Sequence, residues 1–173
     1  MDELRRIIRD VPDFPRKGVV FKDITPLLAS PEAFKKAIDL MADPLRGRDF
    51  DLLVGIESRG FIFAAALAYA LGKGKVPVRK PGKLPAKTVE ISYQLEYGWD
   101  RLEMHEDAIH SGQRVVIVDD VLATGGTARG VASLVEKVGG EVSAFSFFIE
   151  LDFLKGREKL HGLDVFTLLQ YDK

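Results

Sequence analysis

Two neighbouring carboxylates precede a small, hydroxyl-rich turn in the stretch RVVIVDDVLATGGTARG, residues 114–130. Asp119 and Asp120 follow a run of aliphatic residues that predicts a buried strand. Adjacent like charges repel each other, so Mg²⁺ or the hydroxyl groups of a sugar would relieve them. The alternative is a surface turn whose acids favour a nearby helix start. Ligands of α/β proteins bind at the carboxyl ends of strands, and this position favours a binding site.

The turn itself consists of Thr124, Gly125, Gly126 and Thr127. Glycines let backbone N–H groups approach a ligand, threonines add hydroxyl donors, and a helix that begins here adds its positive end. These features predict a phosphate site, and a capped helix with a flexible entry is the alternative. The sequence lacks the Walker motif GxxxxGK[ST], and this turn lacks the dinucleotide-binding motif GxGxxG. The phosphate is therefore expected to belong to another kind of ligand. The two acids beside it indicate a ribose.

Composition excludes several other classes of protein. The 173 residues are 46% hydrophobic and 29% charged, which is typical of one globular domain spanning residues 1–173. A net charge of −1 gives no basic field for nucleic acid or an anionic membrane. The absence of cysteine excludes disulfides and thiolate zinc sites and suits a cytoplasmic location. The most apolar window, 61–71, is about half a membrane span, so we predict a buried helix there.

The elements that must position these residues alternate along the chain. Helices are predicted from Ser30-Pro31-Glu32, from 60 to 72 and after Thr127, and strands at 51–56, 76–78, 113–118, 142–149 and 165–169. This order predicts an α/β fold with a mainly parallel central sheet flanked by helices.

Two segments stand apart from that order. After a short amphipathic helix marked by Leu4, Ile7, Ile8 and Val11, residues of about 10–30 are rich in proline and predict an ordered, irregular hood. Within about 82–105, residues 88–93 and 101–104 alternate as in a hairpin, which predicts a flexible lid.

Further polar clusters lie at other predicted strand ends. Glu57-Ser58-Arg59-Gly60 follows the strand 51–56 and should face the same cleft as Asp119. Arg59 could bind phosphate oxygens there or simply pair with Glu57. The dense basic cluster of Arg79, Lys80 and Lys83 is either an ordinary solvated face or a concentration of charge for an anionic ligand.

The strand, the two acids and the turn together resemble the diphosphoribosyl-binding signature of the type I phosphoribosyltransferases. That resemblance implies the fold of this family. It implies that Asp119 and Asp120 bind the ribose hydroxyls and the Mg²⁺-bound donor. The 5-phosphate would be held by Ala123, Thr124, Gly125, Gly126 and Thr127.

Other stretches narrow the resemblance. VPDFPRKGVVFKDITPLL, GIESRGFIF, RKPGKLP, YQLEYG, LKGREKL and LLQY are similar to the adenine phosphoribosyltransferase family, in its order and over nearly the whole chain. This implies transfer of a phosphoribosyl group from 5-phospho-α-D-ribose 1-diphosphate to N9 of adenine, giving AMP and diphosphate. It also implies Mg²⁺ held mainly through the substrate and a homodimer in which Arg79 crosses the interface.

The resemblance also assigns the remaining site residues. Diphosphate would be bound by Ser58, Arg59, Arg79, Lys80 and Lys83, and adenine by Val20, Phe21 and Lys22. Glu96 would be the acid–base residue near N7, with Tyr97 as part of the lid. The alternatives without a role in binding or catalysis are a solvated turn at Glu96-Tyr97-Gly98 and core packing of Phe14 and Phe21. The chain departs from the family at Glu57, where aspartate is frequent, and at Lys22, where arginine is usual.

Two other functions fit parts of this pattern. A phosphoribosyltransferase-like regulator would sense the donor and bind nucleic acid, but the chain has neither a strongly basic balance nor an added DNA-binding segment. A transferase for another base is the second alternative, because backbone groups of the hood rather than side chains set the choice of base.

Overall fold

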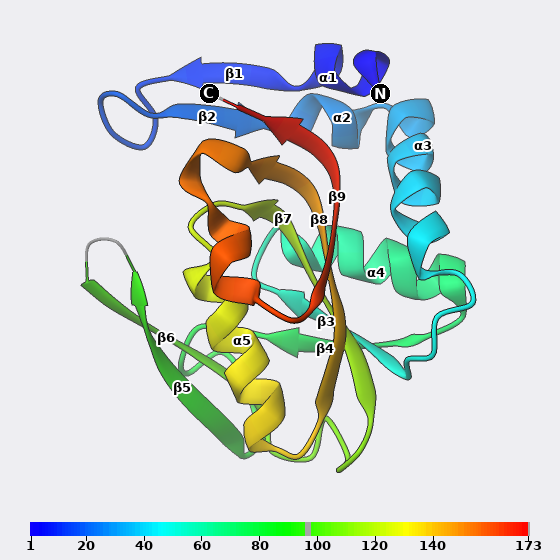
Figure 1. Ribbon diagram of the computed structural model, residues 1–173, viewed down its shortest axis with the longest axis vertical. Helices are drawn as coiled ribbons and strands as arrows, with labels where there is room; N and C mark the ends of the chain where they lie inside the picture. The colour runs from blue at the N-terminus through cyan, green and yellow to red at the C-terminus, as the bar shows by residue number, and fades with distance from the viewer. Residues whose placement is uncertain (96–97, 173) are drawn as a thin grey trace.

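The computed structural model describes residues 1–95 and 98–172, and a parallel five-stranded sheet forms its centre (Figure 1). The strands run in the order β4-β3-β7-β8-β9. Their bounds are Gly74–Val78, Leu52–Ile56, Arg114–Leu122, Glu141–Leu151 and Asp164–Tyr171, in that order. The prediction of an α/β fold with a parallel sheet is confirmed, and every predicted strand is present. Four of the five are longer than predicted, and β3 is one residue shorter.

Helices cover both faces of the sheet. The helices α3 (Pro31–Ala42) and α4 (Gly60–Leu71) pack on one face, where Val116 and Val118 point. The helix α5 (Gly126–Lys137) and the hairpin of β5 (Thr88–Leu95) with β6 (Gly98–His105) cover the other face, toward Val115 and Ile117. The aliphatic run before Asp119 is continuous because a parallel strand of this kind is buried on both sides.

Local signals explain where the helices begin. The Ser30 hydroxyl accepts a hydrogen bond from the backbone N–H of Ala33 (3.3 Å), and Pro31 occupies the first turn of α3. Ala37, Ile38 and Met41 form the buried face of α3.

Residues 1–30 contain more regular structure than predicted. The opening helix is confirmed as α1 (Asp2–Ile7), but Val11 lies in a strand and not on that helix. The strand β1 (Arg9–Pro12) pairs antiparallel with β2 (Val20–Asp23), and α2 (Thr25–Ala29) follows. The prediction that this segment lacks regular structure was therefore wrong for β1, β2 and α2. Its prolines are compatible with a hairpin because Pro12 ends a strand and Pro15 lies in the connection, where no ladder N–H is needed.

The predicted hairpin is present and is longer than predicted. Its role as a flexible lid stays a prediction. The inner face of β6 buries Leu102 and Met104 in the core cluster beside α5, so the base of the hairpin is fixed to the domain. Short 3₁₀ helices complete the chain at Asp43–Leu45, Asp152–Leu154 and Gly156–Leu160. Among the residues described, no helix is both long and apolar enough to span a bilayer.

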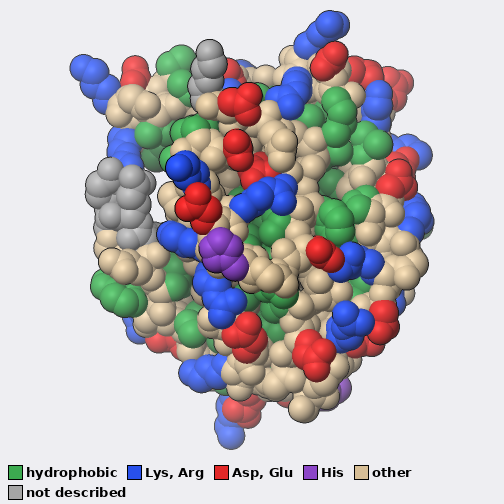
Figure 2. Space-filling view, viewed as in Figure 1, with side chains coloured by type: hydrophobic (Ala, Val, Ile, Leu, Met, Phe, Trp, Pro, Cys, Tyr) green, Lys and Arg blue, Asp and Glu red, His purple; other side chains and the backbone are tan. Residues whose placement is uncertain are grey.

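Charged side chains of both signs are intermixed on the face shown in Figure 2, in agreement with the net charge of −1. No broad basic patch covers that face.

Candidate active site

The two acids lie inside a strand and not after it. The strand β7 continues to Leu122, and Asp119 pairs with Phe147 of β8. The strand was predicted to end before the acids because polar residues there break the aliphatic run. The strand persists because its backbone pairs with β8, whatever its side chains are. Asp120 is 6% exposed, which makes it one of the few buried charged residues.

Asp119 lies in a crowded position. A Cβ atom on Gly60 would come within 2.7 Å of the Asp119 carboxylate and 2.9 Å of the Val118 carbonyl, so only glycine allows α4 to begin here. Burial raises the pKa of Asp119 well above its usual range, and repulsion by the Asp120 carboxylate raises it further. In the free protein, Asp119 therefore holds its proton more tightly than an ordinary aspartate.

Arg59 pairs with Asp120 and not with Glu57. Its guanidinium donates a hydrogen bond to the Asp120 carboxylate and lies 5.1 Å from the centre of the Phe21 ring. The arginine that was predicted to bind diphosphate thus lies between Asp120 and Phe21 of the hood.

Glu57 binds a different part of the basic cluster. Its carboxylate accepts hydrogen bonds from the Arg79 side chain (3.2 Å) and from the backbone N–H of Lys80 (2.7 Å). Of that cluster, Lys80 lines the cleft beside Ser58, whereas the exposed Lys83 is near Arg79 only through its backbone carbonyl (3.5 Å). The structure brings Lys80 into the cleft and Arg79 to Glu57 at its wall, whereas Lys83 is exposed.

Two site residues on the lid hairpin were missed by the sequence analysis. Asp100 forms an ion pair with Lys80 and accepts a hydrogen bond from the Tyr93 hydroxyl (3.2 Å). Burial raises the pKa of Tyr93 to about 12. Tyr93 and Asp100 are opposite each other in the hairpin register, so aligning the hairpin from its tip would have placed them together.

The turn after β7 forms a small cradle. A pocket of about 70 Å³ is lined by residues 121–128 together with Asp119 and Phe147. Gly125 has a φ of 77°, the left-handed region that favours glycine, and α5 begins at the next residue. The predicted phosphate turn therefore has the backbone geometry of an anion-binding helix start.

Another pocket lies under the hood, with a volume of about 310 Å³. Its wall includes Val20, Phe21, Lys22, Arg59 and Asp119. The Lys22 ammonium binds the Asp10 carboxylate (2.8 Å), so the adenine contacts expected at this residue would come from its backbone. Phe14 is 50% exposed and contacts Phe21 edge-on at 5.2 Å, so the core alternative is wrong for Phe14.

These pockets adjoin one another at a single residue. Asp119 lines the hood pocket, the turn pocket and a pocket of about 290 Å³ that contains Ser58, Arg59 and Lys80. The expectation that the two strand ends face one cleft is confirmed. The predicted residues Glu96 and Tyr97 lie outside the described residues.

Residues 23–162 match the model of the phosphoribosyl transferase domain. The chain is 61% identical over 169 residues to an adenine phosphoribosyltransferase of Thermotoga petrophila, with 98% of this chain and 99% of that one covered. Among solved structures, the adenine phosphoribosyltransferase of Thermoanaerobacter pseudethanolicus superposes with a TM-score of 0.96 at 56% identity, covering 98% and 99% of the two chains. The adenine phosphoribosyltransferase of Saccharomyces cerevisiae was solved in complex with adenine and D-2,5-dideoxy-2,5-imino-altritol 1,6-bisphosphate. It superposes with a TM-score of 0.90 at 44% identity, and 97% of each chain is covered.

The chain belongs to the phosphoribosyltransferase family, whose fold and strand-end cleft it has. Within that family it groups with the adenine phosphoribosyltransferases, which are transferases of a pentosyl group.

Proposed function

We propose that the chain transfers the 5-phosphoribosyl group from 5-phospho-α-D-ribose 1-diphosphate to N9 of adenine, giving AMP and diphosphate in purine salvage. The observation that supports this best is the meeting of three pockets at Asp119. The ribose of this donor carries a diphosphate at C1 and a phosphate at C5, and the planar base is the acceptor that attacks C1, so three groups meet around the ribose. The Saccharomyces cerevisiae relative was solved with adenine and a bisphosphate, in keeping with this assignment.

Each pocket takes one of these groups in our proposal. The hood, through Val20, Phe21 and the backbone of Lys22, holds adenine, with Phe21 against its face. Ser58, Arg59 and Lys80 bind the diphosphate, with Arg79 and Lys83 nearby. The turn Ala123-Thr124-Gly125-Gly126-Thr127 binds the 5-phosphate, and Asp119 with Asp120 binds the ribose hydroxyls.

The reaction then breaks the C1–O bond, whose electron pair leaves with the diphosphate, while N9 forms the new bond to C1. Charge develops on the leaving group, so Arg59 and Lys80 stabilise it, and alignment of the two substrates lowers the barrier further. The purine becomes cationic unless it loses a proton, and Glu96 accepts that proton. Tyr97 and the remainder of the lid exclude water, which would otherwise attack C1.

Mg²⁺ fits this site as part of the substrate complex. Oxygen ligands suit this ion, and it usually retains water and phosphate oxygens beside one or two carboxylates. Asp119 and Asp120 are the carboxylates at this place, and Asp120 already pairs with Arg59. When bound, the ion would neutralise charge on the leaving diphosphate, and these two aspartates would hold it together with the donor's own oxygens.

We further propose that the chain is a single domain and acts as a homodimer in the cytoplasm. The Arg79 side chain reaches Glu57 within its own chain here, and in a dimer it could instead reach a neighbouring site.

The decisive experiment is acceptor competition. Purified protein with the donor and Mg²⁺ receives adenine, hypoxanthine, guanine and orotate at equal concentration, and nucleotide products are separated. We expect AMP to dominate. Equal or faster conversion of a 6-oxopurine would contradict the assignment of the base, and a gel shift with DNA or RNA without AMP formation would favour a regulator instead.

A further inference from the structure

An ion pair with a buried carboxylate lies at the carboxyl ends of β8 and β9, outside the three pockets described above. Glu150 is 1% exposed, and its two carboxylate oxygens accept hydrogen bonds from Arg157 at 2.7 and 2.8 Å. Thr167 and Gln170 donate to the same carboxylate at 2.8 and 2.9 Å. A buried charge is stable only when its hydrogen-bonding capacity is filled in this way.

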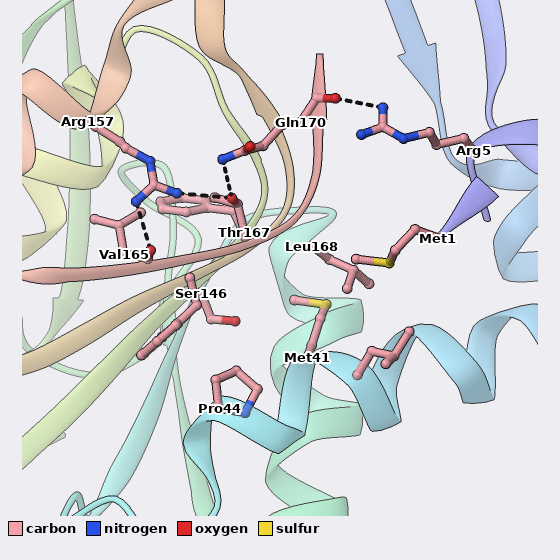
Figure 3. Close-up of a pocket in the computed structure, with 13 residues that line it drawn as sticks. Met1, Arg5, Met41, Pro44, Ser146, Arg157, Val165, Thr167, Leu168 and Gln170 are labelled. Carbon is pink, nitrogen blue, oxygen red and sulfur yellow. Dashed lines mark hydrogen bonds between the residues drawn. The ribbon is translucent and has the colours of Figure 1, made fainter. Parts of the chain in front are cut away.

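Arg157 also ties its own segment to the neighbouring strand. Its guanidinium donates to the carbonyl of Val165 (2.8 Å) and to the Thr167 hydroxyl (3.0 Å), as Figure 3 shows. Burial raises the pKa of Glu150, but the hydrogen bonds from Arg157, Gln170 and Thr167 outweigh it and leave the pKa below its usual range. The charged pair is therefore the stable form, and it fixes the 3₁₀ segment 156–160 to two strands.

The residue before Arg157 touches the 5-phosphate turn directly. A Cβ atom on Gly156 would come within 2.2 Å of the Ala123 carbonyl and 3.1 Å of the Gly125 nitrogen. In the other direction, a Cβ atom on Gly125 would come within 2.3 Å of the Gly156 carbonyl. The two backbones are thus packed face to face, at a distance that only a pair of glycines permits.

This contact bears on the shape of the turn. Gly125 has a left-handed backbone, and on the opposite side the neighbouring residue Lys155 has a positive φ of 52°, which is unfavourable for a lysine. Such conformations persist where the surrounding structure holds them. The Glu150–Arg157 pair is the anchor that connects this segment to the sheet.

We propose that Glu150 and Arg157 are positioning residues that hold Gly156 against the turn 123–127, so that the turn's backbone N–H groups stay aligned for a phosphomonoester. The proposal rests on the assignment of that turn to the 5-phosphate. It gives a role to the stretch LKGREKL, whose Gly156 contacts the turn and whose Arg157 is not among the residues that line the three pockets.

The test compares two ligands that use different ends of the cleft. Ribose 5-phosphate and diphosphate are titrated calorimetrically into the wild type and into Arg157→Leu, Glu150→Gln and Gly156→Ala. We expect affinity for ribose 5-phosphate to fall about tenfold or more, because small displacements of a positioned group cost this much. Affinity for diphosphate should stay within about twofold, and the donor KM should rise more than kcat falls.

Arg48 provides a matched control. It also joins β8 to β9, since it donates to the Ser143 carbonyl (3.3 Å) and pairs with Asp164, but at the opposite end of the sheet. Arg48→Leu should therefore leave affinity for ribose 5-phosphate unchanged, even if its melting temperature falls.

Loss of Arg157 leaves the buried Glu150 carboxylate without its cation, so this single variant could fail to fold. The double variant Glu150→Gln with Arg157→Gln removes both charges and decides the question in that case, with circular dichroism to confirm folding. Unchanged affinity for ribose 5-phosphate in folded variants would overturn the proposal, as would an equal loss for both ligands or the same loss in Arg48→Leu. Failure of the wild type to bind ribose 5-phosphate would instead contradict the proposed function.

Discussion

Arg59 and Asp120 form an ion pair across the cleft, with the aspartate side chain 8% exposed and the arginine side chain 46% exposed. The two residues were expected to bind different groups of the donor, diphosphate and ribose. In the free protein each is the other's partner, so the donor must share or separate this pair when it binds.

Neutralising both acids at the ribose position should strongly weaken the enzyme. We expect Asp119→Asn with Asp120→Asn to lower kcat/KM for the donor by about a hundredfold or more, because hydrogen bonds to charged groups contribute about 1.5–3 kcal/mol each. Steady-state kinetics at varied donor concentration measures this. Asp39→Asn, which removes an exposed ion pair of α3, is the control and should have no effect. A double variant as active as the wild type would refute the ribose assignment.

Glu96→Ala tests the acid–base role implied by the family resemblance. General acid–base groups contribute about 10²- to 10⁴-fold, so turnover should fall within that range while donor affinity changes little. Single-turnover rates and donor binding are measured on the same preparation. Unchanged turnover would remove the assigned role, and a loss confined to donor affinity would assign Glu96 to binding instead.

The Lys80–Asp100 pair should compete with the diphosphate. Asp100→Asn releases the lysine ammonium, and because a partly exposed pair contributes about 0.2–1 kcal/mol, we expect diphosphate to bind up to about fivefold more tightly. Calorimetric titration at two salt concentrations measures the change. Asp107→Asn, an exposed acid beyond the hairpin, has the same change of charge and should bind as the wild type. Weaker binding in Asp100→Asn would mean that Asp100 orients Lys80 for the ligand.

The hood should be sensitive to acid through Asp23. The Thr25 backbone N–H, the Arg9 side chain and the Thr25 hydroxyl all donate to this carboxylate and lower its pKa to about 2. A depressed pKa contributes stability above the unfolded value of about 3.9, and this contribution is lost as the pH falls from about 4 toward 2. Denaturant unfolding across that range should therefore show a steeper loss of free energy in the wild type than in Asp23→Asn. Parallel curves would show that Asp23 does not titrate in this way.

Most of the fold follows from the sequence because its signals are local. The Ser30 cap, the aliphatic strands and the two-sided burial of β7 all act within a few residues. The hairpin of the hood was missed for the opposite reason. Its strands are held by pairing of Val11 with Phe21 across a proline-rich connection, and proline content does not reveal that pairing.

The same distinction between local and long-range signals applies to the candidate site. The turn at Thr124–Thr127 and the acids at Asp119 and Asp120 are contiguous, so their spacing indicated a ligand site. The contacts that link distant segments were not visible in the sequence. Arg59 with Asp120 and Lys80 with Asp100 depend on how two strand ends and a hairpin meet in space, and the sequence analysis considered only a pairing of Arg59 with Glu57.

The internal pairing of the cleft has a kinetic consequence. Three of the cations expected to meet diphosphate, Arg59, Arg79 and Lys80, already face carboxylates of the same protein. An arriving polyanion thus meets a nearly neutral surface, and long-range attraction does little to accelerate the encounter. Binding becomes an exchange of one anion for another, so ionic strength should affect the association rate far less than in a site with unpaired cations.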